Sequence, residues 1–340
     1  MPDAADLLAT LPPIAEEDVG WDALDTRLAG ADQPVVMRNI AARWPLVVAG
    51  REGGPEVRRY LIAHARDRLF EMQIGRPGLE RVFYDEHMAL DFRVEKVSLA
   101  EAFALLEQAE TLDSPPLVYL PSIEIQAYFD GLDRDNRLPL GARATRDGIW
   151  IGGRTKIAAH NDIAHNVAVA ASGRRRFTLF PPGQFANLYL GPLEHSPGGR
   201  PISMVDLAAP AWDSHPRFRA ALAEARVAEL EPGDALFIPS CWYHHVEGRD
   251  RFNVLVNYWW NDEPRFLGHP EDALYHAILA IRDLPQSRRE HWRALFDHYV
   301  FSADPSVAGH IPEAARGILA PLDARTAQQL RAYLLRRLTQ

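Results

Sequence analysis

Between residues 116 and 262 the sequence consists of short runs rich in β-branched and apolar residues, separated by Pro and Gly. Several runs alternate polar and apolar positions, which is typical of strands with one buried face. Many short strands at this spacing favour a sandwich or barrel over a parallel α/β sheet. An insertion at 183–224 interrupts the strands. The sequence therefore predicts a mainly β core.

Helical patterns flank this core. We expect a helical and strand region at residues 1–115 that packs on the core, the core itself at 116–265, and a helical segment at 266–340. Ser98 and Glu101 match a capping box at the start of a helix over 99–108. Near the end of the chain, apolar residues recur at the spacing of one helix face: Leu330, Tyr333, Leu334 and Leu338.

Composition excludes several classes of protein. Cys241 is the only cysteine in the 340 residues, so neither an intramolecular disulfide framework nor a thiolate-rich metal site is possible. The net charge is −9 and basic residues form no stripe, so we expect no nucleic-acid partner. No run of some twenty apolar residues and no basic leader is present, so we expect no membrane association and a cytoplasmic location.

Two potential metal ligands, His160 and Asp162, are two residues apart. On a strand such side chains point to the same face and can reach one ion, although a solvated turn would show the same pattern. A third ligand is available in the segment 241–247, which contains His244 and His245. Glu247 would share a face with His245 and prefers solvent, which turns His244 inward. Two histidines and one carboxylate form the facial triad of non-haem Fe(II) oxygenases.

Arg175 is the candidate for an anion-binding residue. If residues 165–171 and 174–180 form a hairpin around Ser172-Gly173, one face carries Asn166, Ala168, Ala170, Arg175, Phe177 and Leu179. The alternation of the second strand turns this face inward. A buried arginine needs an anionic partner, none of these neighbours supplies one, and a ligand carboxylate would. A surface arginine in a basic triplet is the alternative.

Several motifs occur together and in order, and they carry a family resemblance. They are Pro34-Val35-Val36-Met37-Arg38 followed by Trp44-Pro45, Trp150-Ile151-Gly152, His160-x-Asp162-x-x-x-Asn166, the run from Ser172 to Pro182, the run from Gly233 to Pro239 with Trp242 to Glu247, and Asn257-Tyr258-Trp259. With them the chain resembles the JmjC and cupin-like Fe(II)/2-oxoglutarate oxygenases, specifically bacterial cupin-like domain proteins related to factor-inhibiting HIF, an asparaginyl hydroxylase. The resemblance implies a double-stranded β-helix (jelly-roll) core with flanking helices.

The resemblance also implies roles for individual residues. His160, Asp162 and His244 would be the catalytic metal ligands, with Fe(II), 2-oxoglutarate and O2 as cofactors. Arg175 would bind the distal carboxylate of 2-oxoglutarate, assisted by Tyr119. Further residues map beside the cosubstrate and the metal, namely Asn166, Asn257 and Trp259.

The sequence departs from its relatives at two positions. Factor-inhibiting HIF has Lys where Arg175 stands, and either side chain can anchor a carboxylate. Many relatives have Thr three residues before the first ligand, where this chain has Ile157. Thr155 or Lys156 could take over that contact with the cosubstrate.

Three functions agree with this pattern. The first is a hydroxylase acting on a protein or peptide side chain, the second a small-molecule hydroxylase, and the third a non-catalytic cupin that binds or senses a ligand. The complete set of three ligands favours an enzyme. The resemblance and the terminal apolar stripe further predict a homodimer formed through the C-terminal helices.

Overall fold

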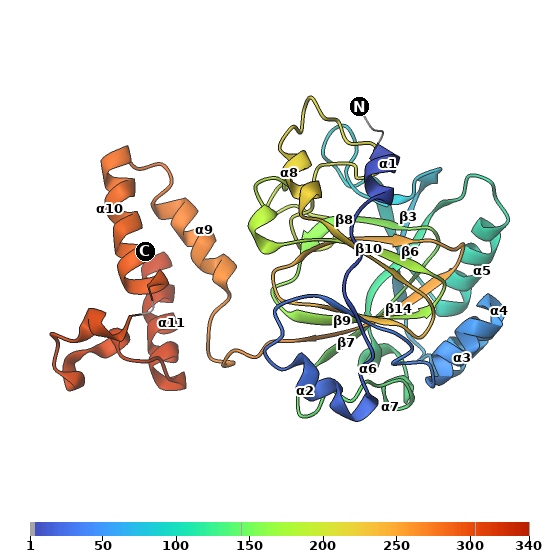
Figure 1. The fold of residues 1–340 in the computed structure, drawn as a ribbon, viewed down its shortest axis with the longest axis horizontal. Helices are drawn as coiled ribbons and strands as arrows, with labels where there is room; N and C mark the ends of the chain where they lie inside the picture. Colours follow the sequence, from blue (N-terminus) through green and yellow to red (C-terminus); the bar gives the residue numbers. More distant parts are fainter. Residues whose placement is uncertain (1–3, 144, 303, 340) are drawn as a thin grey trace. The chain divides into compact units, whose positions relative to one another are not determined.

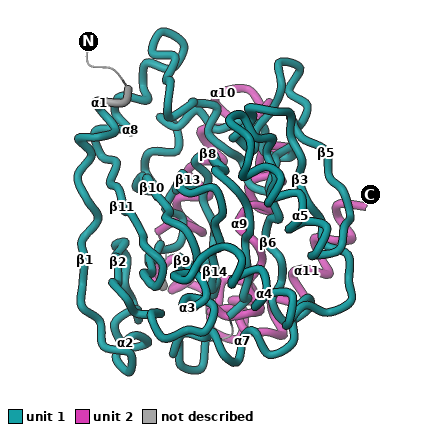
Figure 2. The backbone as a smooth tube through the Cα atoms, turned by 90° about the vertical axis from the view of Figure 1, so that its right-hand side faces the viewer, with its two compact units in different colours: residues 1–261 teal, residues 262–340 magenta. Residues whose placement is uncertain are grey.

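The computed structural model describes residues 4–143, 145–302 and 304–339. The chain divides into two compact units, residues 1–261 and residues 262–340, which we call unit 1 and unit 2 (Figure 2). Unit 1 contains both β-sheets and all residues of the candidate site. Within the described residues of unit 2, the regular secondary structure is entirely helical.

The larger sheet of unit 1 has strands in the order β1-β2-β12-β9-β14-β7-β6-β3-β5. The bounds are β1 Glu16–Glu17, β2 Val35–Met37, β3 Phe70–Pro77, β5 Phe92–Val97, β6 Pro116–Glu124, β7 Arg146–Gly152, β9 His165–Ser172, β12 Ala235–Ile238 and β14 Asn253–Trp260. Strands that precede residue 116 therefore extend a sheet whose centre lies in the predicted core.

The smaller sheet has the order β11-β10-β13-β8-β4. Its strands are β4 Arg81–Val82, β8 Lys156–Asn161, β10 Arg175–Phe180, β11 Arg226–Leu230 and β13 Tyr243–Gly248. Strand pairs in both sheets are antiparallel except for β1 with β2 and β4 with β8. Two mainly antiparallel sheets with flanking helices confirm the predicted fold class, a jelly-roll of the cupin type.

The two sheets enclose an apolar core. Alternate residues of β9 and β10 meet there, namely Ala168 and Ala170 from β9 and Phe177 and Leu179 from β10. The alternation in the sequence therefore identified the inward faces of both strands correctly.

The predicted hairpin pairing of these two strands is wrong. Strand β9 pairs with β12 and β14 in the larger sheet, whereas β10 pairs with β11 and β13 in the smaller one. Gly173 lies between them at φ 68°, where a Cβ atom would come within 2.5 Å of the Phe252 carbonyl oxygen. The chain thus crosses from one sheet to the other, and the inward residues face each other across the core instead of along a ladder.

Helices and the insertion cover the outer faces of the sheets. The helices of unit 1 are α1 Ala4–Ala9, α2 Leu24–Leu28, α3 Pro45–Glu52, α4 Gly54–His64, α5 Leu99–Glu110, α6 Ile125–Tyr128, α7 Leu132–Asp135 and α8 Phe218–Ala223. In Figure 1, α8 and the pair α6 and α7 lie on opposite sides of the strands. The predicted capping box is confirmed, because the Ser98 side chain accepts from the Glu101 N–H and the Glu101 carboxylate accepts from the Ser98 N–H.

Unit 2 contains α9 Pro270–Ala280, α10 Gln286–Phe296 and α11 Ala324–Leu338. Helix α11 confirms the predicted terminal helix, and Asp323 caps it by accepting from the Thr326 N–H. Among the described residues of both units, we find no helix with the length and apolar character needed to cross a membrane.

Candidate active site

The structure brings His160, Asp162 and His244 together at one end of the sandwich. His160 of β8 lies directly opposite His244 of β13, and their ring centroids are 4.4 Å apart. Asp162 follows the end of β8, and its Oδ2 lies 3.9 Å from Nε2 of His244. The proposed ligands from two segments of the sequence are therefore neighbours in space.

A β-bulge turns His160 inward. Val246 pairs with Ile157 and His244 pairs with His160, so β8 has one more residue than β13 between these two pairs. In a regular strand without a bulge, His160 and Ile157 are three positions apart and would point to opposite faces. The bulge thus places the imidazole on the same side as His244.

Both imidazoles are oriented by backbone carbonyls. Nδ1 of His160 lies 2.9 Å from the Ala158 oxygen, and Nδ1 of His244 lies 3.2 Å from the Trp242 oxygen. A proton on each Nδ1 leaves Nε2 with a free lone pair, which is the form that binds metals. Burial, with a smaller contribution from His160, lowers the pKa of His244 to about 4. His244 is therefore neutral at physiological pH.

The Asp162 carboxylate is held by a chain of hydrogen bonds. The Trp259 indole N–H donates to Oδ2 at 3.0 Å and the Asn166 amide donates to the same oxygen at 3.5 Å. Asn257 in turn donates to Asn166 Oδ1 at 2.7 Å. Burial alone would raise the pKa of Asp162, but His244, His160 and the Trp259 N–H lower it below its ordinary value. Asp162 therefore remains ionised.

Arg175 is buried, with an exposed fraction of 2%. Its Nε has no hydrogen-bond partner, and within the described residues no carboxylate pairs with it. Burial lowers the pKa of Arg175, and the adjacent Tyr119 opposes this. The other two arginines of the triplet differ, because Arg174 pairs with Asp250 at 2.8 Å and Arg176 pairs with Glu229 at 3.0 Å.

Tyr119 extends the environment of Arg175. It is buried on β6, stacks against Trp150 with centroids 6.1 Å apart, and burial raises its pKa. Ile157, at the position where relatives have Thr, packs against the same apolar cluster. Lys156 instead pairs with Glu80 at 2.7 Å, which leaves Arg175 as the better placed cation for a buried carboxylate.

His245 has a different environment from His244. Its Nε2 lies 3.4 Å from Oε1 of Glu247, two positions along the same face of β13. Burial opposes ionisation of Glu247, but the contact with His245 and the nearby Arg249 and Arg176 lower its pKa to about 2. His245 thus belongs to a pair with Glu247 on the outer face, as the alternation predicted.

The donor chemistry of the triad fits Fe(II). Two imidazole nitrogens and one carboxylate are the donor set of facial-triad sites. Within the described residues, however, no three His, Cys, Asp or Glu side chains are gathered closely enough to enclose an ion as they stand. A metal bound by these residues would require the three side chains to move closer together.

Two arginines near the triad were not predicted from the sequence. Arg200, in the insertion, donates to the Asn161 carbonyl at 2.9 Å, and Arg146 lies over the Trp259 ring at 5.7 Å. Neither belongs to a recognisable motif, and only the path of the insertion brings Arg200 close to Asp162.

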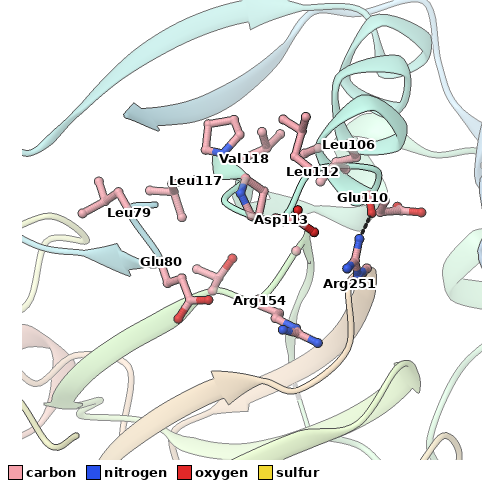
Figure 3. Close-up of a pocket in the computed structure, with 15 residues that line it drawn as sticks. Leu79, Glu80, Leu106, Glu110, Leu112, Asp113, Leu117, Val118, Arg154 and Arg251 are labelled. Carbon is pink, nitrogen blue, oxygen red and sulfur yellow. Dashed lines mark hydrogen bonds between the residues drawn. The ribbon is translucent and has the colours of Figure 1, made fainter. Parts of the chain in front are cut away.

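A separate cavity lies outside this site (Figure 3). It is lined by Leu106, Asp113, Arg154 and Arg251 among others, and Arg251 donates to the Glu110 carbonyl. Its space is about 60 Å³, which is enough for a few water molecules only. None of the predicted site residues lines it.

Comparison with known proteins places the chain in context. The profile of the cupin-like domain family matches residues 21–266. Lysine-specific demethylase JMJ31 of Arabidopsis thaliana is 35% identical over 30% of this chain and 18% of its own length. HSPB1-associated protein 1 of Homo sapiens is 29% identical over 44% of this chain and 31% of its own length. tRNA wybutosine-synthesizing protein 5 of Gallus gallus is 27% identical over 38% of this chain and 43% of its own length. The matched region thus spans less than half the length of each of these relatives.

Proposed function

This chain belongs to the cupin-like domain family, and we propose that it is an Fe(II)- and 2-oxoglutarate-dependent oxygenase that hydroxylates a protein or peptide side chain. Support comes from the combination of His160, Asp162 and His244 in one place with a buried cation on the adjacent strand. One of the similar proteins is named a lysine-specific demethylase, and lysine is a side chain of the kind that the proposed substrate class contains.

The single observation that carries the proposal is the unpaired burial of Arg175. An isolated buried charge costs several kcal/mol, and natural proteins rarely retain one without a partner. The guanidinium has a planar fork of N–H donors that matches a carboxylate. 2-Oxoglutarate carries a carboxylate at each end, so one end can bind Arg175 while the other faces the triad.

His160, Asp162 and His244 would hold the metal. When bound, Fe(II) together with 2-oxoglutarate and O2 supplies the oxidising power for C–H hydroxylation. The protein's own contributions are positional. The carbonyl oxygens of Ala158 and Trp242 fix the tautomers of the two histidines, and Trp259 orients the carboxylate of Asp162.

The remaining residues bind the cosubstrate and exclude water. Arg175 would hold the distal carboxylate with Tyr119 beside it, and both are buried. Apolar residues of the core between the sheets, including Phe177, Leu179 and Leu255, would line the inner side of the cosubstrate site. Residues 160–165 are partly exposed, so a side chain of a peptide can reach the triad from outside.

The proposal is tested by measuring succinate formation from 2-oxoglutarate by the full-length protein. We expect succinate when Fe(II), ascorbate and air are present and none after EDTA treatment. Arg174→Gln, which removes an arginine of the same triplet that is already paired, is the control and should retain turnover. Absence of succinate at saturating Fe(II), with the metal shown to be bound, would contradict the proposal.

We also propose that unit 2 mediates homodimer formation. The C-terminal part of helix α11 carries four apolar side chains that are each more than a third exposed: Tyr333, Leu334, Leu335 and Leu338. A second copy of the same helix could cover such a face in an isologous contact. The arrangement supports a role in assembly that is separate from the chemistry of unit 1.

A further inference from the structure

A second hollow of the surface lies on the insertion between β10 and β11, and we call it the insertion groove. It has a volume of about 490 Å³, which is in the range of ligand-binding clefts. All the residues that line it come from the stretch 185–217, and none of them belongs to the candidate active site. The argument below uses four of them: Phe185, Tyr189, Met204 and Arg217.

The insertion groove lies along the edge of the strand that carries His160. Two stretches of the insertion, 189–191 and 202–204, pair with each other through backbone hydrogen bonds. The N–H of Ser203 donates to the carbonyl of Ala159 at 2.7 Å, which places this ladder on the edge of β8. Ala159 directly precedes His160. A molecule bound in the groove therefore lies near the candidate active site without occupying it.

The wall of the groove is largely apolar and open to solvent. The Phe185 side chain is 58% exposed. Met204 is half-buried beside it, and a methionine side chain adapts to partners of different shape. Aromatic residues and methionine are enriched where one protein binds another, and an exposed apolar hollow of this kind indicates a binding surface.

Tyr189 is held in an unusual backbone conformation. Its φ is 50°, in the left-handed region that bulky residues rarely adopt. The ring lies against His215, with centroids 4.7 Å apart, and the guanidinium of Arg217 lies 4.5 Å from the ring centre. The Tyr189 hydroxyl accepts from the Arg217 N–H at 3.0 Å. Conformations of this kind cluster at active sites and ligand-binding sites, which points to binding at this ring.

Arg217 brings a positive charge to the groove. Its Nε and Nη2 both donate to the Ala186 carbonyl, at 3.4 and 3.1 Å. Among the residues that the structure describes, no carboxylate pairs with Arg217 and no Asp or Glu lines the groove. Because a guanidinium has five N–H donors, these contacts leave donors for a carboxylate of a ligand. The Tyr189 ring stacks on the guanidinium and fixes its plane.

We propose that the insertion groove binds a peptide segment of a protein partner in which a large apolar side chain stands next to an acidic residue. The apolar side chain packs on Phe185 and Met204, and the carboxylate binds Arg217. Charge complementarity favours this segment over a basic one. The apolar wall favours a peptide over a free phosphate or a nucleic-acid backbone, which carry charge without apolar side chains. The inference goes beyond the proposed function and does not require it.

The test follows peptide binding by NMR on the full-length protein labelled with carbon-13 in its methionine methyl groups. Met204 lines the groove, and its signal is assigned by its absence in Met204→Leu. The probes are capped heptapeptides of glycine and serine that carry a central phenylalanine–glutamate, phenylalanine–glutamine, phenylalanine–lysine or alanine–glutamate pair. The phenylalanine–glutamate probe should shift the Met204 signal and leave that of Met37, which is buried in a core cluster, in place.

Titrations give the affinity of each probe. The phenylalanine–glutamate probe should bind about fivefold more tightly than the phenylalanine–glutamine probe, which is the upper end of what one exposed ion pair contributes. It should bind at least about tenfold more tightly than the alanine–glutamate probe, because the phenylalanine ring buries more apolar area. The phenylalanine–lysine probe should be the weakest of the three phenylalanine probes, and added salt should reduce the preference for glutamate.

Substitutions then identify the cation. Arg217→Gln should remove the preference for glutamate, and Arg217→Glu should reverse it in favour of lysine. The matched control is Arg219→Gln, because Arg219 is also exposed, lies over the Trp212 ring at 4.2 Å and does not line the groove. It should leave the preference unchanged. Phe185→Ala should weaken the three phenylalanine probes alike, and thermal unfolding of each variant checks that it is folded.

Equal affinity for the glutamate and glutamine probes on the unaltered protein would overturn the inference, whether or not every variant folds. An unmoved Met204 signal at millimolar peptide, or an equal loss of preference in the Arg219 variant, would also overturn it. So would a Met204 signal that shifts with protein concentration in the absence of peptide, since a second copy of the chain would then fill the groove. Peptide binding without any succinate formation would leave this inference standing and reject the proposed function. Succinate formation without a charge preference in peptide binding would do the reverse.

Discussion

Unit 1 and unit 2 differ in where their apolar side chains lie. Unit 1 buries large residues in several clusters, including Phe70, Phe129, Phe177, Phe237 and Tyr258. In unit 2, within residues 262–302 and 304–339, the buried hydrophobic residues are Ala308 and Ala327. Among the residues that the structure describes, most of the large hydrophobic side chains that are more than a third exposed belong to unit 2, although it is the smaller unit.

This difference separates two roles. Burial of large apolar side chains contributes about 1.5–3 kcal/mol for each residue, so unit 1 can stabilise its own fold and hold a site rigidly. Among its described residues, unit 2 has little such burial, and it leaves Tyr333, Leu334, Leu335 and Leu338 of α11 exposed. We therefore propose that unit 1 carries the chemistry and unit 2 the assembly, and variants in one unit should leave the property of the other unchanged.

The largest effect should come from removal of a triad residue. His160→Ala, Asp162→Ala or His244→Ala should each abolish Fe(II)-dependent succinate formation, because each removes one of three metal ligands. Light scattering should give the same mass as for the unaltered protein. Substantial turnover in any of the three variants would show that the metal is held elsewhere, and a change in mass would break the separation between the units.

Arg175→Ala should raise the apparent Michaelis constant for 2-oxoglutarate by at least about tenfold. A charge-assisted hydrogen bond contributes roughly 1.5–3 kcal/mol, and the bidentate contact is lost in this variant. Tyr119→Phe should have a smaller effect of the same kind. Steady-state succinate formation at varied 2-oxoglutarate measures both constants. An unchanged Michaelis constant for the Arg175 variant would show that another residue binds the carboxylate of 2-oxoglutarate, and Lys156 would be the first to examine.

In unit 2, the double variant Leu330→Arg/Leu334→Arg should convert a dimer into a monomer. Charges placed on the apolar face of α11 cannot be buried against a second copy without a large desolvation cost. Light scattering at micromolar concentration measures the mass. The rate of uncoupled 2-oxoglutarate turnover should stay within about twofold of that of the unaltered protein. A change of about 1.4 kcal/mol at the site would alter the rate tenfold. A monomer of the 38.2 kDa chain before substitution would refute the dimer.

A smaller effect should come from Asp147 in unit 1. This carboxyl is buried, its Oδ1 has no hydrogen-bond partner, and burial raises its pKa. Because the folded pKa lies above the unfolded value of about 4, the protein loses stability as the pH rises through the interval between the two values. Asp147→Asn should therefore raise the unfolding midpoint at pH 7 by about 2–4 °C, as roughly 1 kcal/mol does in a domain of this size.

The pH dependence identifies the cause. As the pH falls towards 4, the carboxyl takes up a proton in the folded state before it does in the unfolded state, so the advantage of Asp147→Asn should shrink there. Thermal unfolding monitored by circular dichroism at both pH values is the measurement. An equal shift at pH 4 and pH 7 would attribute the effect to packing instead of charge.

Much of the fold and the candidate site could be predicted from the sequence because strand alternation and metal-ligand spacing are local patterns. The alternation placed Arg175 inside, and it separated His244 from His245, which pairs with Glu247 on the outer face. The pairing of β9 with β10 was mispredicted because alternation defines the face of a strand but not the sheet to which the strand belongs. Only the fold shows that Gly173 carries the chain between sheets.

The arginines near the triad lay outside the reach of sequence analysis for a related reason. Arg200 is 38 positions from Asp162 along the printed sequence, and its approach depends on how the insertion folds back onto β8. Arg146 approaches Trp259 through the register between β7 and β14. Both contacts depend on long-range pairing, which carries no periodic signal.

The central claim, that unit 1 holds iron through His160, Asp162 and His244, is tested most directly by the iron content of His244→Ala and His245→Ala. The two positions are adjacent, carry the same side chain and face opposite sides of β13, so the pair controls for general disruption of the strand. After reconstitution with Fe(II) without O2 and removal of unbound metal, we expect His245→Ala to retain about one iron per chain and His244→Ala to lose it. Retention in the His244 variant together with loss in the His245 variant would contradict the account.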